Sequence, residues 1–223
     1  MSARRDFRIA VLISGSGTNL QALIDAVDSG ALPARITRVI SNRDAAAGLA
    51  RARQAGIATE VLDHRGFSDR AAYDRALAER LEAAGVDLIV LAGFMRILGD
   101  AFVDRFLGRL INIHPSLLPA YRGLRTHERV LAAGESRHGC SVHYVIPELD
   151  AGPVIAQAAL PVTPEDTPER LATRVQAMEH RLYPEVVRWC AEGRVTLAGD
   201  QVEHDGVIHA EPPCPVADTA DTP

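Results

Sequence analysis

Hydrophobic runs alternate with amphipathic stretches through the first half of the chain. Short, continuously apolar runs predict buried strands over residues 8–13, 35–40, 58–62 and 86–91. Between them, apolar residues spaced three or four apart predict helices over residues 20–27, 45–55, 68–84 and 100–106, the third of these capped by Ser68. Strands that alternate with helices favour a parallel sheet covered by helices on its faces, so the pattern indicates an α/β fold.

The second half of the chain has a different pattern. A strand over residues 110–114 and a helix ending at Ala133 precede two further strands, residues 139–146 and 154–162, which a turn joins as an antiparallel pair. A long amphipathic helix opens at Thr167, and a hairpin of residues 195–197 and 202–208 follows it.

The predicted fold is therefore a single Rossmann-like open sheet. Its N-terminal part is mostly parallel, and it has an antiparallel C-terminal extension and flanking helices. We expect one domain over residues 1–210 and a disordered tail over residues 211–223, which are polar and rich in proline.

A glycine-rich turn, SGSGTN at residues 14–19, lies between the first predicted strand and the first helix. Backbone amides converge in such a turn, and the helix dipole adds positive potential, so the turn suits an anion. It has no lysine, unlike the P-loop, and Leu20 stands where the dinucleotide fingerprint needs a third glycine. A single phosphate group fits best, and a tight turn without any ligand is the alternative.

Asn112 and His114 project from the same face of a predicted strand that Pro115 ends. In an open α/β sheet, ligands bind at such strand ends. The apolar segment 92–98 follows another strand and is either core or one wall of a pocket for a flat heterocycle. Taken alone, Asp150 is a common turn residue and Glu179 a solvated helix residue.

Composition narrows the class of protein further. The chain of 223 residues is 47% hydrophobic and 24% charged, with a net charge of −5 and a pI near 5.9. This is the composition of a soluble globular protein, and the acidic balance argues against nucleic acid as a partner. No segment has the pattern of a signal peptide or could span a membrane, so we expect neither.

The cysteines and histidines give two further expectations. Cys140, Cys190 and Cys214 are odd in number and far apart, which suits a reducing, cytoplasmic setting. His127 begins a sequence like a zinc motif, but Leu131 stands where the second histidine belongs, so we expect no metal.

Several of these segments together resemble the phosphoribosylglycinamide formyltransferases, the folate-dependent enzymes of de novo purine synthesis. The matching motifs lie at residues 13–21, 91–98, 111–119, 138–143 and 148–153, and the similarity runs from about Arg8 to the final hairpin. The resemblance implies that a formyl group passes from the co-substrate 10-formyltetrahydrofolate to the amine of 5′-phosphoribosylglycinamide. The transfer would be direct, through a tetrahedral intermediate, with no covalent enzyme intermediate and no metal.

The resemblance also implies a role for each matching residue. The catalytic residues it implies are Asn112, His114 and Asp150. Those implied for the ribonucleotide are Gly17, Thr18, Asn19 and Glu179. Those implied for the folate are Arg70, Met95, Arg96, Ile97, Leu98 and Asn112. The partners would be these small molecules only, and the protein would be a monomer or a homodimer.

The sequence departs from the family pattern at two positions. Arg122 stands where members commonly have proline, and Arg125 where they often have histidine. Two other functions remain open at this point. A formyltetrahydrofolate deformylase would use a similar asparagine, histidine and aspartate with water as the acceptor, and a non-catalytic module would keep only the phosphate-binding turn.

Overall fold

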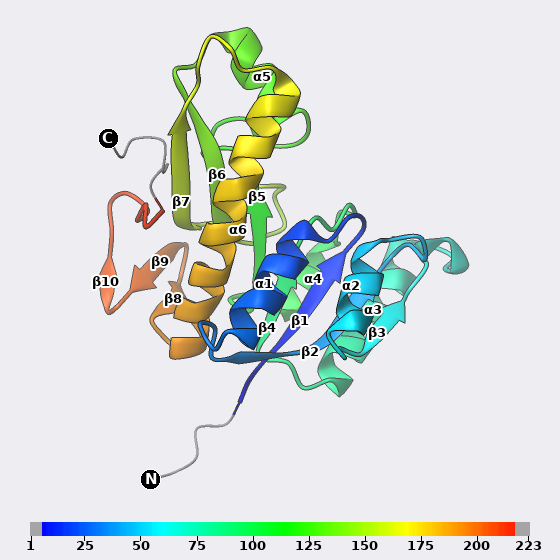
Figure 1. Ribbon diagram of the computed structural model, residues 1–223. Helices are drawn as coiled ribbons and strands as arrows, with labels where there is room; N and C mark the ends of the chain where they lie inside the picture. Colours follow the sequence, from blue (N-terminus) through cyan, green and yellow to red (C-terminus); the bar gives the residue numbers. More distant parts are fainter. Residues whose placement is uncertain (1–5, 217–223) are drawn as a thin grey trace.

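A seven-stranded sheet runs through the computed structural model, which describes residues 6–216 (Figure 1). In spatial order the strands are β3 (Thr59–Val61), β2 (Ala34–Ser41), β1 (Phe7–Ile13), β4 (Leu88–Leu91), β5 (Leu110–His114), β6 (Arg137–Tyr144) and β7 (Val154–Pro161). The first five strands in this order are parallel to their neighbours, whereas β6 and β7 join antiparallel. The predicted fold class is thereby confirmed.

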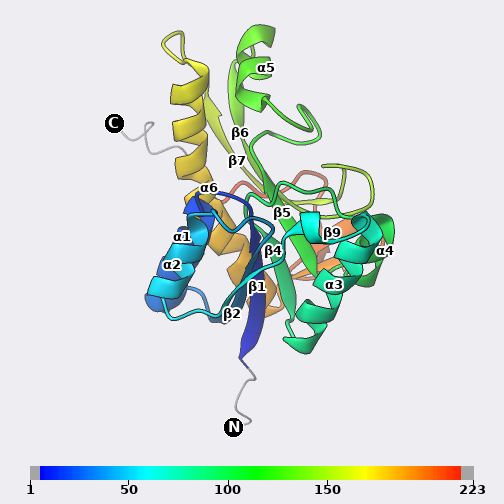
Figure 2. The ribbon, with the colours of Figure 1, turned by 90° about the vertical axis from the view of Figure 1, so that its right-hand side faces the viewer.

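Helices cover both faces of the sheet, as the edge-on view in Figure 2 shows. One face carries α1 (Thr18–Asp28), α2 (Gly48–Gln54) and α6 (Pro168–Glu192), and the other carries α3 (Arg70–Ala83) and α4 (Asp100–Arg105). A further helix, α5 (Thr126–Ala133), precedes β6, and the short 3-10 helix η1 (His64–Gly66) precedes α3.

Strand β1 shows why its sequence is apolar without alternation. Ile9, Val11 and Ile13 belong to the core under α1 and α6, whereas Ala10 and Leu12 belong to the core under α3 and α4. Successive side chains of a strand point to opposite faces, so a strand with helices on both sides needs apolar residues at every position. All five side chains are fully buried.

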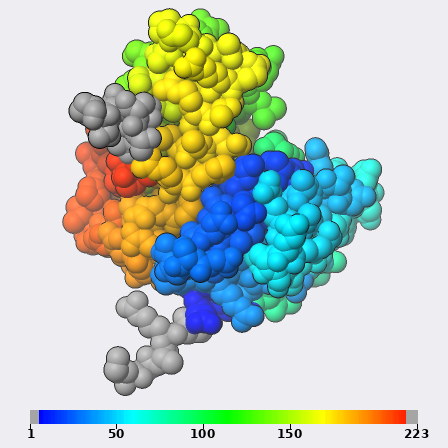
Figure 3. All heavy atoms as spheres, viewed as in Figure 1, coloured from blue at the N-terminus to red at the C-terminus, as the bar shows by residue number. Residues whose placement is uncertain are grey.

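The long helix α6 brings the C-terminal half of the chain back to the first βα turn. Thr167 caps it through a hydrogen bond from the Arg170 N–H, and Pro168 occupies its first turn, where no backbone donor is needed. It packs on α1 and on the face of β6 and β7, and in Figure 3 the two helices lie side by side on the surface. Glu179 is buried in this contact.

Three details differ from the sequence-based expectations or extend them. Asp69, rather than Ser68, caps α3 by accepting from the Ala72 N–H at 2.7 Å. Residues 202–208 form two strands because Asp205 and Gly206 both take positive φ and make a turn. A separate small antiparallel sheet results, with β8 (Val195–Ala198), β9 (Gln201–His204) and β10 (Val207–Ile208).

The described part of the predicted tail, residues 211–216, lies alongside β7. The Gln157 N–H donates to the Pro213 carbonyl at 3.0 Å, and Val216 forms a bridge with Ala158. Residues 217–223 lie outside the described residues, so the boundary at 210 stays a prediction. None of the helices within residues 6–216 is long and apolar enough to cross a membrane.

The approach of β6 to β7 makes a testable prediction at Gly139. A Cβ atom there would lie 1.9 Å from the Ala158 carbonyl oxygen, which belongs to the neighbouring strand and cannot move aside. We expect Gly139→Ala to lower the free energy of unfolding by more than about 2 kcal/mol, measured by urea denaturation.

Gly66→Ala is the matched control, because a Cβ atom there meets nothing within 4 Å. It should change the free energy of unfolding by less than about 1 kcal/mol. Equal stability of the two variants would contradict the register of β6 and β7.

Candidate active site

The ladder between β5 and β6 places Asn112 opposite His143. Residues that face each other across a ladder have neighbouring side chains, and the Asn112 Nδ2 atom lies 3.2 Å from the His143 Nε2 atom. His114 lies two residues further along β5, on the same side, and its side chain is buried like that of His143. The predicted pair of amide and imidazole is therefore present, with a second imidazole added.

Asp150 reaches the pair from the turn between β6 and β7. Its Oδ2 atom lies 3.5 Å from the His114 Nδ1 atom, and its Oδ1 atom lies 3.9 Å from the His143 Nε2 atom. The Gly123 N–H donates to Oδ2 at 3.0 Å. Asp150 itself has a φ of 49°, a left-handed conformation that costs a residue with a side chain about 1–3 kcal/mol. The structure thus brings Asn112, His114 and Asp150 together.

The hydrogen bonds of His143 define its tautomer. Its Nδ1 atom lies 2.9 Å from the Tyr144 carbonyl, which can only accept, so the proton is on Nδ1. Burial lowers the pKa of His143, which keeps the ring neutral and leaves Nε2 as an acceptor. Nε2 therefore accepts one of the two N–H bonds of the Asn112 amide, and the other N–H remains for a ligand.

His114 faces an acceptor at each ring nitrogen. Nδ1 faces Asp150, and Nε2 lies 3.1 Å from the Tyr121 carbonyl oxygen. A ring that carries both protons satisfies both contacts. The Tyr121 carbonyl occupies the Nε2 donor that a ligand oxygen would need, so the segment around Tyr121 belongs to the site.

The glycine-rich turn leads into α1 a short distance away along the sheet edge. Gly17 has a φ of 71°, and a Cβ atom on it would lie 2.5 Å from the Gly48 Cα atom, so only glycine fits. The next two residues, Thr18 and Asn19, begin α1, whose first backbone N–H groups have no partner within the helix.

Asn19 is joined to Glu179, the predicted carboxylate on α6. The Asn19 Nδ2 atom donates to the Glu179 Oε2 atom at 2.8 Å. Burial raises the pKa of Glu179, and the hydrogen bond from Asn19 opposes this rise. The Asn19 Oδ1 atom is buried and has no partner in the described structure. An orphaned buried acceptor beside a buried carboxylate suits a ligand that donates hydrogen bonds.

An arginine side chain to which the sequence analysis gave no role lies beside the glycine-rich turn. Arg51, on α2, donates from Nε to the Ser16 carbonyl at 2.9 Å and from Nη1 to the Gln21 side chain at 3.3 Å. The turn has no lysine, and Arg51 supplies positive charge from a position more than thirty residues later in the chain. No local motif signals it.

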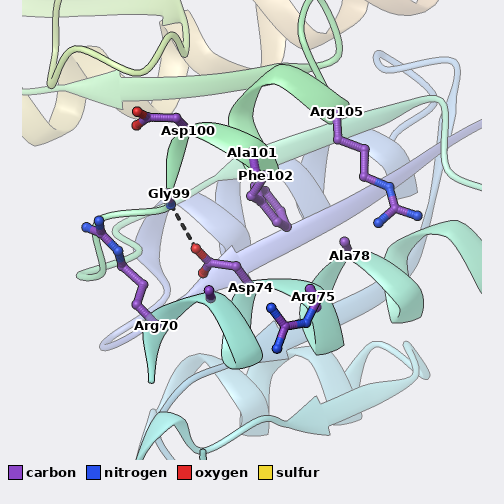
Figure 4. A pocket seen from close by; sticks show the side chains of 10 residues that line it. Arg70, Asp74, Arg75, Ala78, Gly99, Asp100, Ala101, Phe102 and Arg105 are labelled. Carbon is purple, nitrogen blue, oxygen red and sulfur yellow. Dashed lines mark hydrogen bonds between the residues drawn. The ribbon is translucent and has the colours of Figure 1, made fainter. Parts of the chain in front are cut away.

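Side chains hold the loop that follows β4, residues 92–99, at three points. The Met95 N–H donates to the Ser14 hydroxyl at 2.7 Å, the Arg96 guanidinium lies 4.7 Å from the Tyr73 ring centre, and the Gly99 N–H donates to Asp74 at 2.8 Å (Figure 4). A loop anchored in this way presents a defined surface to a ligand.

The predicted folate residues divide by exposure. Met95 and Ile97 are 60% and 58% exposed, whereas Leu98 is buried in the core. Arg70 lines a cavity of about 330 Å³ between α3 and α4, together with Asp74 and Gly99 (Figure 4). Two apolar side chains and one arginine of the predicted set are thus available to a ligand.

Sequence reasoning left other site residues without a role. Tyr121 and Gly123 act through backbone atoms, and His143 takes part through its ring. The period of two along residues 139–146 places His143 on one face with Ser141, which was the available signal. Backbone contacts from a loop leave no such signal.

Within residues 6–216, no group of three or more histidine, cysteine or acidic side chains could hold a metal ion.

Fold and site together define an α/β enzyme with an asparagine, histidine and aspartate cluster at the carboxyl ends of its strands. The family model described as "Formyl transferase" matches residues 7–187, so the class is that of the formyl transferases.

Comparison with known proteins narrows the class of formyl transferase. The chain is 50% identical to the phosphoribosylglycinamide formyltransferase of Escherichia coli over 198 residues, which are 89% of this chain and 93% of that protein. A solved phosphoribosylglycinamide formyltransferase from Coxiella burnetii superposes with a TM-score of 0.91 at 54% identity, over 95% of this chain and all of that one. A formyltetrahydrofolate deformylase from Pseudomonas putida superposes with a TM-score of 0.82, but at 25% identity over 92% of this chain and 72% of that one. The chain belongs to the phosphoribosylglycinamide formyltransferase family.

The tautomer of His143 is a testable prediction. Burial places its pKa below the ordinary value of 6.5, so at pH 6.5 the ring should be mostly neutral, with its proton on Nδ1. Nitrogen-15 NMR of the histidine rings distinguishes this form from the other tautomer and from the cation. A His143 ring that is mostly protonated at pH 6.5 would contradict the assignment.

Proposed function

We propose that the protein transfers the formyl group of 10-formyltetrahydrofolate to the amine of 5′-phosphoribosylglycinamide, and that Asn112, His114 and Asp150 are its catalytic residues. The observation that carries this proposal is the convergence of these three side chains in a sheet whose neighbouring strands β1 and β4 lead into the glycine-rich turn and the loop 92–99. Relatives about 50% identical over most of the chain are named for this activity.

The chemistry is addition to the formyl carbon followed by elimination. The substrate amine attacks that carbon, a new C–N bond forms, and the formyl oxygen gains negative charge. The free N–H of Asn112 and the Nε2–H of His114 stabilise this oxygen, and one such donor typically contributes about 3–4 kcal/mol. The bond to folate N10 then breaks, and a proton that leaves the amine replaces the formyl group on that nitrogen.

Asp150 orients His114 and balances its positive charge during this step. For His114 to reach the formyl oxygen, its Nε2–H must exchange the Tyr121 carbonyl for the ligand. The Tyr121 segment therefore shifts in the productive complex. No side-chain nucleophile is required, because the attacking group belongs to the substrate.

The two ligand segments suit the two substrates. The ribonucleotide phosphate binds the amides at Gly17, Thr18 and Asn19, with Arg51 adding charge, and Glu179 lies on the same side of the site. The flat ring of the folate lies against Met95 and Ile97, beside Leu98 and the backbone of Arg96. Arg70 takes an acidic group of the folate from the α3 side.

Arg122 and Arg125, which depart from the family pattern, lie in the segment between β5 and α5. The Arg122 guanidinium pairs with Glu148 at 2.6 Å, two residues before Asp150, and Arg125 takes a positive φ at the start of α5. We propose that Arg122 steadies the turn that carries Asp150 and leaves the catalytic residues unchanged.

The remaining expectations are consistent with this function. A single domain over residues 1–210, a cytoplasmic setting for three separated thiols, and small molecules as the only partners all suit an enzyme of purine synthesis. Whether the protein is a monomer or a homodimer stays a prediction.

The test is a formyl-transfer assay. Purified protein receives 10-formyltetrahydrofolate with and without 5′-phosphoribosylglycinamide, and the deformylated folate is followed by absorbance. We expect release only when the ribonucleotide is present, and a loss of about 100-fold or more in His114→Ala. His209→Ala, at an exposed histidine near the C-terminus, should remain as active as the wild type. Release without the ribonucleotide would identify a deformylase, and binding without any release a non-catalytic module.

Arg51 gives a second prediction. Arg51→Gln removes the charge beside the phosphate turn, so KM for the ribonucleotide should rise about tenfold while kcat stays within about twofold. Arg53→Gln is the matched control on the same helix, because the Arg53 side chain is exposed and donates to Thr59 instead. An equal KM in the two variants would contradict a role for Arg51 in binding the phosphate.

A further inference from the structure

The Ser14 side chain, which the proposed mechanism does not use, makes one buried and one partly buried hydrogen bond. Its hydroxyl donates to the Asn42 Oδ1 atom at 2.6 Å and accepts from the Met95 backbone N–H at 2.7 Å. Ser14 is 3% exposed and Asn42 2% exposed, so water does not compete for the hydroxyl or the amide. A hydroxyl that donates once and accepts once in a buried setting is well satisfied.

The three residues follow three adjacent parallel strands. Asn42 comes directly after β2, Ser14 directly after β1, and Met95 lies in the loop after β4, and these strands are neighbours in the sheet. One hydroxyl thus links the carboxyl ends of three strands. Ligands bind at this edge in open α/β sheets.

Ser14 begins the glycine-rich turn, whereas Met95 lies in the middle of the loop 92–99. The other anchors of these two segments differ in place. The turn is held by α2, through Gly48 and Arg51, and the loop is held by α3, through Tyr73 and Asp74. At its first residue, the loop also bonds β1, where the Ala92 N–H donates to the Leu12 carbonyl at 2.9 Å. Among the described residues, the Ser14 hydroxyl makes the only hydrogen bond between residues 14–19 and residues 92–99.

We propose that Ser14 is a positioning residue that couples the two substrate sites, so that the ribonucleotide on the turn strengthens the binding of folate against the loop. The proposal rests on the proposed function, which places one substrate on each segment. A ligand that orders the turn also fixes the Ser14 hydroxyl, and the hydroxyl fixes the Met95 backbone. Coupling of this kind is reciprocal, so bound folate strengthens the binding of the ribonucleotide by the same factor.

The experiment measures binding in a complex that cannot react. Tetrahydrofolate carries no formyl group, so it can be titrated by calorimetry into the protein alone and into the protein saturated with 5′-phosphoribosylglycinamide. In the wild type we expect the ribonucleotide to lower the Kd of tetrahydrofolate by about fivefold or more. In Ser14→Ala this factor should fall to about one, because neither hydrogen bond remains.

Two further variants separate coupling from stability. Thr37→Val removes a hydroxyl that bonds the Ile9 carbonyl between the same strands β1 and β2, away from the site, and should keep the wild-type factor. Asn42→Ala removes the acceptor of the Ser14 hydroxyl, keeps Ser14 itself, and should lower the factor part of the way. It also tests the link if Ser14→Ala does not fold.

The outcomes are distinct. A wild-type factor of one would overturn the coupling, and so would an unchanged factor in Ser14→Ala. If Ser14→Ala does not fold, an unchanged factor in Asn42→Ala would overturn it. In each of these cases, formyl transfer by the wild type would still support the proposed function. A wild type that neither binds the ribonucleotide nor transfers the formyl group would overturn both. Loss of coupling in Thr37→Val as well would assign the effect to general loosening of the sheet and reject a specific role for Ser14.

Discussion

The antiparallel pairing of β6 with β5 is the constraint on which the site depends. It sets Asn112 opposite His143, and it directs the chain through the turn that returns Asp150 to His114. A shift of one residue in this register would turn His143 to the face of the sheet opposite to Asn112. The buried contact of Gly139 with β7 holds the register from the other side.

His114 and His143 are buried and have a hydrogen-bond partner nonetheless, which explains their chemistry. His143 is neutral because burial lowers its pKa, and its tautomer orients the Asn112 amide. Asp150 accepts from the Gly123 backbone N–H and faces Nδ1 of His114, so its carboxylate has two donors. In such surroundings, donors aimed at a developing oxyanion act more strongly than they do in water.

The ends of the parallel strands bring the glycine-rich turn and the loop 92–99 to the same edge of the sheet, and helices from both layers hold them there. Helix α6 adds Glu179 to the turn, and α3 supports the loop through Asp74. The similarity to phosphoribosylglycinamide formyltransferases over most of the chain agrees with this arrangement. The deformylase, which is only 25% identical, shares the scaffold. The fold alone therefore does not distinguish an amine from water as the acceptor of the formyl group.

The sequence by itself determined the parallel half of the fold, because continuous apolar runs between amphipathic helices leave few other arrangements. It also singled out Asn112 and His114, since a period of two places them on one face, and the family motifs added Asp150. Only the tertiary structure decided how His143, the Tyr121 carbonyl and Arg51 join the site, because each arrives through a contact between residues distant in the chain. It also showed two strands in residues 202–208, although the Asp205-Gly206 pair is a local sequence typical of a left-handed hairpin turn.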